Sequence, residues 1–312
     1  MRQENEPVVV RDLRKTFYDE GRGEVKAVDS ISFECHEGEV FGLLGANGAG
    51  KTTTLRMLST ILTPTSGSAT IMGNDVVRNP EGVRKNLGFY SATTALYPRL
   101  TTRETIEFFA RVNQHPAERV KERVDFLINR FGLAKYADAR IEKLSSGMKQ
   151  KVSIARTIAH DPAILIFDEP TVGLDVLNAL DVQEAISELR SEGKTIIFST
   201  HQMEVAERIC DDICLINRSR KVLEGSIREI KQASGRNAVA LRFEGGDSVL
   251  DDKSLVSKVE RHSDGVEVLL AEQASAQDLL QRLVATGATI GRFEMIEPSL
   301  NQIFIAKVKE SS

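Results

Sequence analysis

A short apolar run followed at once by a glycine-rich turn most constrains the fold of this chain. Residues 40–44 read Val-Phe-Gly-Leu-Leu, and residues 45–52 read Gly-Ala-Asn-Gly-Ala-Gly-Lys-Thr. The second stretch fits G-x-x-x-x-G-K-[ST] at every specified position. We expect a helix directly afterwards, from Thr53 to Leu62. A buried strand, a glycine turn and a helix in this order predict an α/β protein with a phosphate site at the strand end.

The chemistry of this turn indicates a nucleotide with a magnesium ion. Glycines let the backbone wrap around phosphate oxygens, while the Lys51 ammonium reaches the β and γ phosphates and the Thr52 hydroxyl binds Mg²⁺. The alternative is a glycine-rich turn that binds no nucleotide. The predicted nucleotide-binding residues of this segment are Gly45, Ala46, Asn47, Gly48, Ala49, Gly50, Lys51, Thr52 and Thr53.

Two further apolar runs, residues 163–167 and 195–198, are also followed by polar loops. Continuous apolar runs are typical of strands that are buried on both faces of a parallel sheet. Ligands of such sheets bind beyond the carboxyl ends of the strands. We therefore expect the three loops to converge on one site.

The loops after these two strands carry the candidate catalytic groups. Asp168 ends the first strand, where a carboxylate can hold Mg²⁺, and Glu169 follows it, where a carboxylate can polarise an attacking water. Adjacent carboxylates can instead form a solvated turn. His201 lies just beyond the second strand and is placed to contact the γ-phosphate and water, although a lone histidine is often structural.

The rest of the chain divides into further layers. Alternating residues around 8–10 and 31–33, with a turn at 21–23, predict an antiparallel layer, and residues 98–160 predict a helical insertion. A boundary near residues 232–235 separates a first domain, 1–232, from a small α+β domain, 236–312. In the second domain we expect strands over 239–243, 266–270 and 289–293 and helices over 277–284 and 300–308. We also expect its last helix to join two subunits through Leu300, Ile303, Phe304 and Val308.

Composition excludes several classes of function. The 312 residues carry a net charge of −4, which gives no reason to expect nucleic acid as a partner. The apolar runs are far shorter than the ~20 residues that a membrane helix needs. Any membrane role is therefore expected to come through a partner.

A second small-residue turn also opens a helix, at Leu144-Ser145-Ser146-Gly147-Met148-Lys149-Gln150. Free backbone N–H groups at a helix start favour an anion. Kinases and small GTPases use one phosphate site and would leave this second turn without a purpose.

Residues 7–230 resemble the ATP-binding subunits of ABC transporters. The turn at 45–52 is similar to the Walker A motif, 144–152 to the signature motif, and 164–169 to Walker B with its catalytic glutamate. Residues 173–175 resemble the D-loop, and 199–201 resemble the segment of the switch histidine. Phe17 is similar in position to the aromatic residue that stacks on adenine, with Tyr18 as the alternative.

The resemblance implies the role of the second turn. In this family two copies pack head to tail, and each ATP lies between one copy's Walker A turn and the other's signature. Ser145 and Gly147 are then expected to contact a γ-phosphate held by the other subunit's Lys51. The implied cofactors are ATP and Mg²⁺, with Thr52 and Asp168 on the metal and Glu169 and His201 in catalysis. The implied partner is an integral membrane permease, with this chain peripheral on the cytoplasmic face of the cell membrane.

This sequence departs from the family pattern at two places. Ala92 stands where a glutamine is expected in the Q-loop, and Ser91, Thr93 or Thr94 can replace that glutamine only through water. The signature has Ser146 and Met148 where the family has glycine and glutamine. These variations resemble the NatA-type sodium-efflux and drug-export branch. The expected function is ATP-driven export, of sodium or of a drug or lipid-like substrate, and the alternative is a soluble ABC ATPase that acts as an ATP switch on a non-membrane partner.

Overall fold

The computed structural model describes residues 6–21, 23–91, 94–234, 238–262, 265–271 and 273–310. The chain forms two compact units, Met1–Gly225 and Ser226–Ser312. The division falls before helix α8, Ile227–Ala233, which the sequence prediction assigned to the first domain. Helix α8 contacts the last helix of the second unit, and its Ile227 and Ile230 are buried.

A six-stranded sheet forms the centre of the first unit, in the order β10-β9-β3-β8-β7-β6. Every residue of β3, β7 and β8 is buried, as the three apolar runs predicted. The pairs β9–β3, β3–β8, β8–β7 and β7–β6 are parallel. The strand bounds are β3 Val40–Leu44, β6 Leu87–Ser91, β7 Ile164–Asp168, β8 Thr195–Thr200, β9 Asp212–Asn217 and β10 Arg220–Ser226.

The register of these strands aligns their carboxyl ends. Leu44 pairs with Thr200, and Asp168 pairs with Ser199 on one side and Ser91 on the other. The loops that follow β3, β7 and β8 therefore leave the sheet at one edge, as the sequence predicted.

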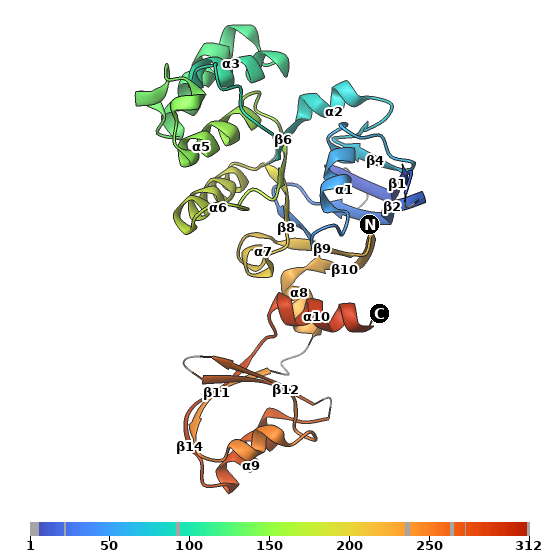
Figure 1. Ribbon diagram of the computed structural model, residues 1–312, viewed down its shortest axis with the longest axis vertical. Helices are drawn as coiled ribbons and strands as arrows, with labels where there is room; N and C mark the ends of the chain where they lie inside the picture. The colour runs from blue at the N-terminus through green and yellow to red at the C-terminus, as the bar shows by residue number, and fades with distance from the viewer. Residues whose placement is uncertain are drawn as a thin grey trace. The chain divides into compact units, whose positions relative to one another are not determined.

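A four-stranded antiparallel sheet with the order β2-β1-β4-β5 forms a second layer. Helix α1 lies beside it in Figure 1, and apolar residues of α1, of this sheet and of the central sheet share one core cluster. The rings of Phe33 and Phe41 join the two sheets, with centroids 4.9 Å apart. The bounds are β1 Val8–Asp19, β2 Gly23–Cys35, β4 Ser66–Ile71 and β5 Asn74–Asp75.

Helix α1 spans Lys51–Leu58 and is shorter than predicted. Thr60 takes a left-handed φ of 61°, and the N–H groups of Ile61 and Leu62 both donate to the Arg56 carbonyl. Such back-bonding satisfies the last helical carbonyls and ends a helix. The prediction that this helix continues to Leu62 was therefore wrong. The other helices around the central sheet are α2 Pro80–Asn86, α6 Val176–Ser191 and α7 Met203–Ile209.

The predicted helical insertion is present. Thr101 and Glu104 form a reciprocal capping box at the start of its first helix, which fixes where that helix begins. Its core is formed by Ile106, Val124, Leu127 and their apolar neighbours. The bounds are α3 Thr102–Val112, α4 Val120–Arg130 and α5 Ser146–Thr157, with short 3₁₀ turns at Ala117–Arg119, Ala134–Tyr136 and Ile141–Lys143.

The second unit has a four-stranded antiparallel sheet in the order β12-β13-β11-β14. Helix α9 contributes Leu279 and Leu283 to the core on this sheet. The bounds are β11 Ala238–Glu244, a 3₁₀ turn Asp247–Asp251, β12 Val256–His262, β13 Gly265–Leu270, α9 Ala276–Ala285, β14 Thr289–Ile296 and α10 Leu300–Glu310.

The predicted subunit contact on α10 was wrong for Leu300 and Ile303. Both side chains are already buried within the chain, at 2% and 5% exposure. Among the described residues, none of the helices has the length and apolar character needed to cross a membrane.

Candidate active site

The glycine turn after β3 requires glycine at two positions. Gly45 and Gly50 have φ values of 147° and 112°, in the region that disfavours side chains. A Cβ atom on Gly45 would lie 2.2 Å from the Ile216 carbonyl oxygen, and one on Gly50 would lie 2.5 Å from the Ala27 carbonyl oxygen. The backbone therefore passes too close to its neighbours for a side chain at either position.

The other predicted residues of this turn differ in how far they are exposed to solvent. Ala46, Asn47 and Gly48 are exposed and Ala49 is buried, while Thr52 and Thr53 are half-buried in the first turn of α1.

Lys51 connects the glycine turn to the loop after β7. Its side chain is 5% exposed, and its ammonium donates to the Gly45 carbonyl at 2.7 Å. The same ammonium lies 3.1 Å from a carboxylate oxygen of Glu169. This ion pair brings together two groups that are 118 positions apart in the numbering.

Thr52 and Asp168 form the candidate metal site. The Thr52 hydroxyl donates to Asp168 Oδ1 at 3.1 Å, and the Ser199 hydroxyl donates to the same oxygen at 2.8 Å. Burial raises the pKa of Asp168, the two hydrogen bonds oppose this shift, and the nearby charge of Glu169 adds to it. A hydroxyl and a carboxylate in contact are hard oxygen ligands of the kind that Mg²⁺ prefers. The residues present therefore fit the predicted ion.

Glu169 is held in an unusual backbone conformation at the carboxyl end of β7. Its φ is 49°, which is uncommon for a residue with a side chain. Its N–H donates to the Ser199 hydroxyl at 3.0 Å. Its carboxylate lies 3.0 Å from His201 Nδ1, so both predicted catalytic side chains face one another. Together with Lys51, Thr52 and Asp168 they form one constellation at the sheet edge.

Phe17 lies on the antiparallel sheet that approaches the glycine turn. It pairs with Val25 of β2, two residues before the Ala27 carbonyl that lies against Gly50. Phe17 is 42% exposed and Lys15 Nζ lies 5.2 Å from its ring centroid, whereas Tyr18 is 88% exposed. A ring that is part-packed and part-open suits stacking on a base better than a ring surrounded by water.

The second turn makes its contacts elsewhere in the first unit. Ser145 is exposed and caps α5, with its hydroxyl accepting from the Met148 N–H at 3.3 Å. A Cβ atom on Gly147 would lie 2.4 Å from Asn178 Oδ1 on α6. Asn178 in turn is bound by Asp175, the last residue of the D-loop, with Nδ2 2.6 Å from Asp175 Oδ2. The turn at Ser145 thus rests on α6.

The Q-loop prediction falls partly outside the described residues, because Ala92 and Thr93 are not among them. Ser91 is buried at the end of β6, opposite Asp168, and its carbonyl accepts from the Thr94 N–H at 3.0 Å. The proposed water-mediated substitution by Ser91, Thr93 or Thr94 stays a prediction.

Ser199, Gln150 and Tyr90 contact the candidate site although they are not among the predicted site residues. Ser199 binds both Asp168 and the Glu169 N–H. Its position near the carboxyl end of a buried strand could have indicated from the sequence that it belongs to the site. Gln150 accepts from the Tyr90 hydroxyl at 2.9 Å and donates to the Pro170 carbonyl at 3.1 Å. Nothing local in the sequence indicates the Gln150 contacts, since Tyr90 lies 60 positions away.

Comparisons with known proteins identify the family of the chain. The family model of ABC transporters matches residues 28–172, and a model described as the C-terminal domain of DrrA1-3-like ATP-binding proteins matches residues 225–308. The ABC transporter ATP-binding protein NatA of Bacillus subtilis is 38% identical over 72% of this chain and 92% of its own length. The daunorubicin/doxorubicin resistance ATP-binding protein DrrA of Streptomyces peucetius is 31% identical over 90% of this chain and 87% of its own.

A solved structure is similar as well. It is described as the dimeric structure of a post-hydrolysis state of the ATP-binding cassette MJ0796 bound to ADP and Pi. It is 25% identical, covers 71% of this chain and 99% of its own, and has a TM-score of 0.64. The comparisons confirm the predicted fold class, an ABC ATPase domain followed by a C-terminal domain, and the predicted resemblance to NatA-type and drug-resistance relatives. ABC ATPases bind ATP, with Mg²⁺ as the usual partner, and hydrolyse it. This chain belongs to the ATP-binding proteins of ABC transporters.

Proposed function

We propose that two copies of this chain form a head-to-tail ATP-driven motor for a separate membrane permease. The proposal rests on one observation: the two predicted phosphate-binding turns of the chain lie at different places in the first unit. Lys51, Asp168 and Glu169 converge behind the first turn. The second turn, at Ser145, is exposed and rests on α6 instead. A second copy supplies the signature turn that completes each nucleotide site.

The surface beside the D-loop supports a subunit interface there. Val176 and Leu177 follow Asp175 directly and are 75% and 76% exposed. Adjacent apolar side chains left open to water are typical of surfaces that another protein covers. The dimer described for MJ0796 shows that a similar cassette assembles in pairs.

Each residue of the constellation has a role in this proposal. The backbone N–H groups of residues 45–51 and the Lys51 ammonium hold the β and γ phosphates. Thr52 and Asp168 bind Mg²⁺, and Phe17 stacks on the base. Glu169 accepts a proton from the attacking water, while His201 orients that carboxylate and contacts the γ-phosphate. Ser145 and Gly147 contact the γ-phosphate held by the partner.

The direction of transport and the cargo form the finer part of the proposal. DrrA is a drug-resistance ATP-binding protein by name, and the model that matches residues 225–308 is described as the C-terminal domain of DrrA1-3-like ATP-binding proteins. We infer export, of sodium ions or of a drug or lipid-like substrate, with this chain peripheral on the cytoplasmic face of the membrane. The cargo path belongs to the permease.

Reconstitution tests this function. The chain carrying an affinity tag is purified from detergent-solubilised membranes, and the complex is returned to lipid vesicles. We expect a multi-span membrane protein to co-purify and to raise the ATPase rate, and Glu169→Gln to abolish that stimulated rate. Full ATPase activity in the soluble fraction, with no membrane protein bound, contradicts the motor and favours an ATP switch on a non-membrane partner.

A further inference from the structure

Gln150 bridges three segments that the reaction uses. It lies one turn into α5, after the signature turn, and its Oε1 accepts from the Tyr90 hydroxyl at 2.9 Å. Its Nε2 donates to the Pro170 carbonyl at 3.1 Å. Tyr90 belongs to β6, the strand that leads into the Q-loop, and Pro170 follows Glu169. One carboxamide therefore connects the signature helix, the Q-loop strand and the catalytic turn.

The bridge has a fixed polarity. Tyr90 is 2% exposed, and its ring lies 5.7 Å from that of Phe167, so the hydroxyl has little freedom to move. A carbonyl such as that of Pro170 can only accept, so the Gln150 amide must point its nitrogen there. A carboxylate at position 150 would keep an acceptor for Tyr90 but would face the Pro170 oxygen with a second acceptor.

The turn at the far end of the bridge is the one that places the catalytic carboxylate. Glu169 has a left-handed φ of 49°, and such a conformation persists only where its surroundings enforce it. Ser199 holds the turn from one side through the Glu169 N–H. Gln150 holds it from the other side through the next carbonyl. A shift of α5 therefore pulls directly on the backbone that carries Glu169.

We propose that Gln150 is a positioning residue that couples the two ATP sites of the dimer. The inference rests on the proposed head-to-tail assembly. In that assembly the signature turn of one subunit contacts the ATP held by its partner, whereas Glu169 acts on the ATP of its own subunit. The Gln150 bridge makes the position of Glu169 depend on the nucleotide in the other site.

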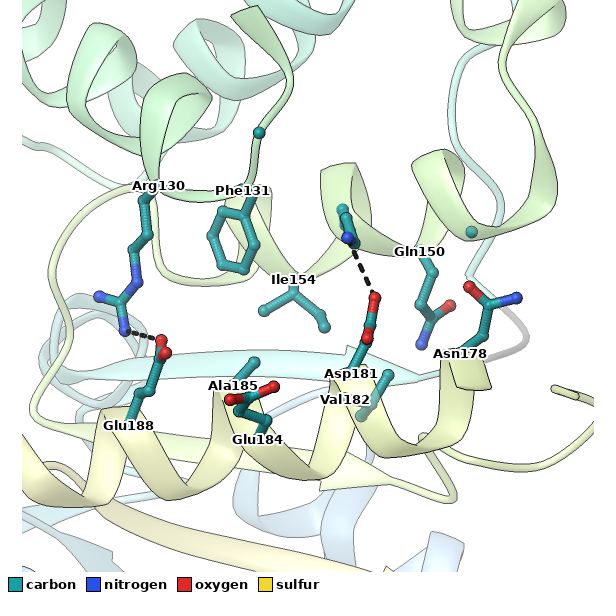
Figure 2. A pocket seen from close by; sticks show the side chains of 13 residues that line it. Arg130, Phe131, Gln150, Ile154, Asn178, Asp181, Val182, Glu184, Ala185 and Glu188 are labelled. Carbon is teal, nitrogen blue, oxygen red and sulfur yellow. Dashed lines mark hydrogen bonds and ion pairs between the residues drawn. The ribbon is translucent and has the colours of Figure 1, made fainter. Parts of the chain in front are cut away.

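The same cavity supplies a matched control. Gln150, Asn178 and Asp181 all line a cavity of about 320 Å³ between α4, α5 and α6 (Figure 2). Lys151 and Asp181 join α5 to α6 across it, with 3.0 Å between Nζ and Oδ2. This ion pair touches neither Tyr90 nor the catalytic turn. Breaking it loosens the same helix contact without cutting the bridge.

The test compares Gln150→Glu, Tyr90→Phe and the control Asp181→Asn in the full-length chain. Each variant is measured for ATP affinity, for kcat and for the Hill coefficient of ATP hydrolysis. We expect Gln150→Glu to lower kcat by about tenfold or more and to bring the Hill coefficient close to 1, with ATP affinity within about threefold. Tyr90→Phe removes a single hydroxyl and should lower kcat by about fivefold with a smaller Hill coefficient than wild type. Asp181→Asn should keep both within about twofold, as exposed ion pairs contribute little.

The outcomes separate this inference from the proposed function. ATP-induced dimers are detected by size-exclusion chromatography of the Glu169→Gln background. If no dimers form, the head-to-tail motor itself fails. If dimers form but the Hill coefficient is the same in wild type, Gln150→Glu and Tyr90→Phe, coupling does not run through Gln150. Tyr90→Phe keeps the test decisive if Gln150→Glu fails to fold, because only one buried oxygen is removed.

Discussion

The two phosphate turns of this chain differ in what surrounds them. Behind the turn at Gly45–Thr52, the buried Lys51 ammonium contacts the Glu169 carboxylate, and the Thr52 hydroxyl contacts the Asp168 carboxylate. The turn at Ser145–Gly147 has a capping hydroxyl and a close contact with Asn178, and its first residues are exposed. In the proposed dimer, the first turn binds and cleaves ATP, and the second turn contacts the ATP of the partner subunit.

From this difference we infer which property each turn controls. The groups behind the first turn meet within one chain, so we expect the first turn to set the affinity of a single subunit for ATP. The second turn is exposed and lacks such groups, so we expect it to control hydrolysis only in the proposed dimer. Substitutions in the two turns should therefore change different measurements.

The largest expected effect is on catalysis at the first turn. Glu169→Gln removes the carboxylate that we propose accepts a proton from water, but leaves Lys51 and Thr52 in place. We expect kcat to fall by about 10²–10⁴-fold while ATP still binds, and ATP-bound dimers to accumulate. Single-turnover hydrolysis and size-exclusion chromatography measure the two effects. Turnover near the wild-type rate would remove Glu169 from the catalytic role.

The second turn gives the next largest effect. Gly147→Asp places a negative charge against the partner's γ-phosphate, and like charges at an interface cost several kcal/mol, or about 100-fold or more in rate. ATP binding to the isolated subunit should stay within about threefold. Gly147→Asn is the matched control, because it meets Asn178 in the same way but carries no charge. Equal loss in both variants would assign the defect to crowding of α6 and not to phosphate repulsion.

Lys51→Ala should weaken the binding of ATP. The substitution removes charge-assisted hydrogen bonds to phosphate, which are each worth about 1.5–3 kcal/mol, or about 10–100-fold in affinity. It also frees Glu169 from its ion pair at 3.1 Å. Equilibrium titration with a fluorescent ATP analogue measures the change. An unaltered dissociation constant would contradict a role of the first turn in affinity, because both turns would then control only hydrolysis.

A further expected effect concerns the free energy of unfolding and leaves ATP binding and hydrolysis unchanged. Beyond the end of α5, burial lowers the pKa of His160 to about 4, and its Nε2 lies 3.2 Å from the Leu87 carbonyl. The unfolded chain, with a histidine pKa near the usual ~6.5, binds the proton first as the pH falls. The contribution of neutral His160 to the free energy of unfolding is therefore fully present above about pH 6.5. It is lost as the pH falls toward about 4, and the loss reaches about 2–3 kcal/mol at pH 4.5.

Urea unfolding at pH 7.5 and pH 4.5 checks this prediction. The non-titrating variant His160→Gln should lose about 2–3 kcal/mol less than wild type between the two pH values. Parallel losses in both proteins would mean that His160 is not kept neutral by burial in the folded chain.

The sequence allowed the first turn to be predicted in more detail than the second. The strands that end at Leu44, Asp168 and Thr200 are continuous apolar runs, and a parallel sheet brings their ends together without further information. The bridge from Gln150 to Tyr90 and Pro170 depends on how a helical insertion packs on the sheet, which no local pattern encodes. The prediction that Leu300 contacts a second subunit was wrong for a related reason. An apolar helix face can equally be covered by residues of the same chain.

Mixing two inactive variants tests whether each ATP site is shared between two subunits. Lys51→Ala has a defective first turn and a normal second turn, and Gly147→Asp has the reverse. A mixed head-to-tail dimer contains one site in which a normal Lys51 meets a normal signature turn. We predict that part of the ATPase activity returns on mixing and rises with the fraction of mixed dimers, measured with two differently tagged chains. The return is partial because the intact site lacks a nucleotide-bound partner site to couple with. Mixed dimers that form and yet hydrolyse no ATP would contradict nucleotide sites that are shared between two subunits.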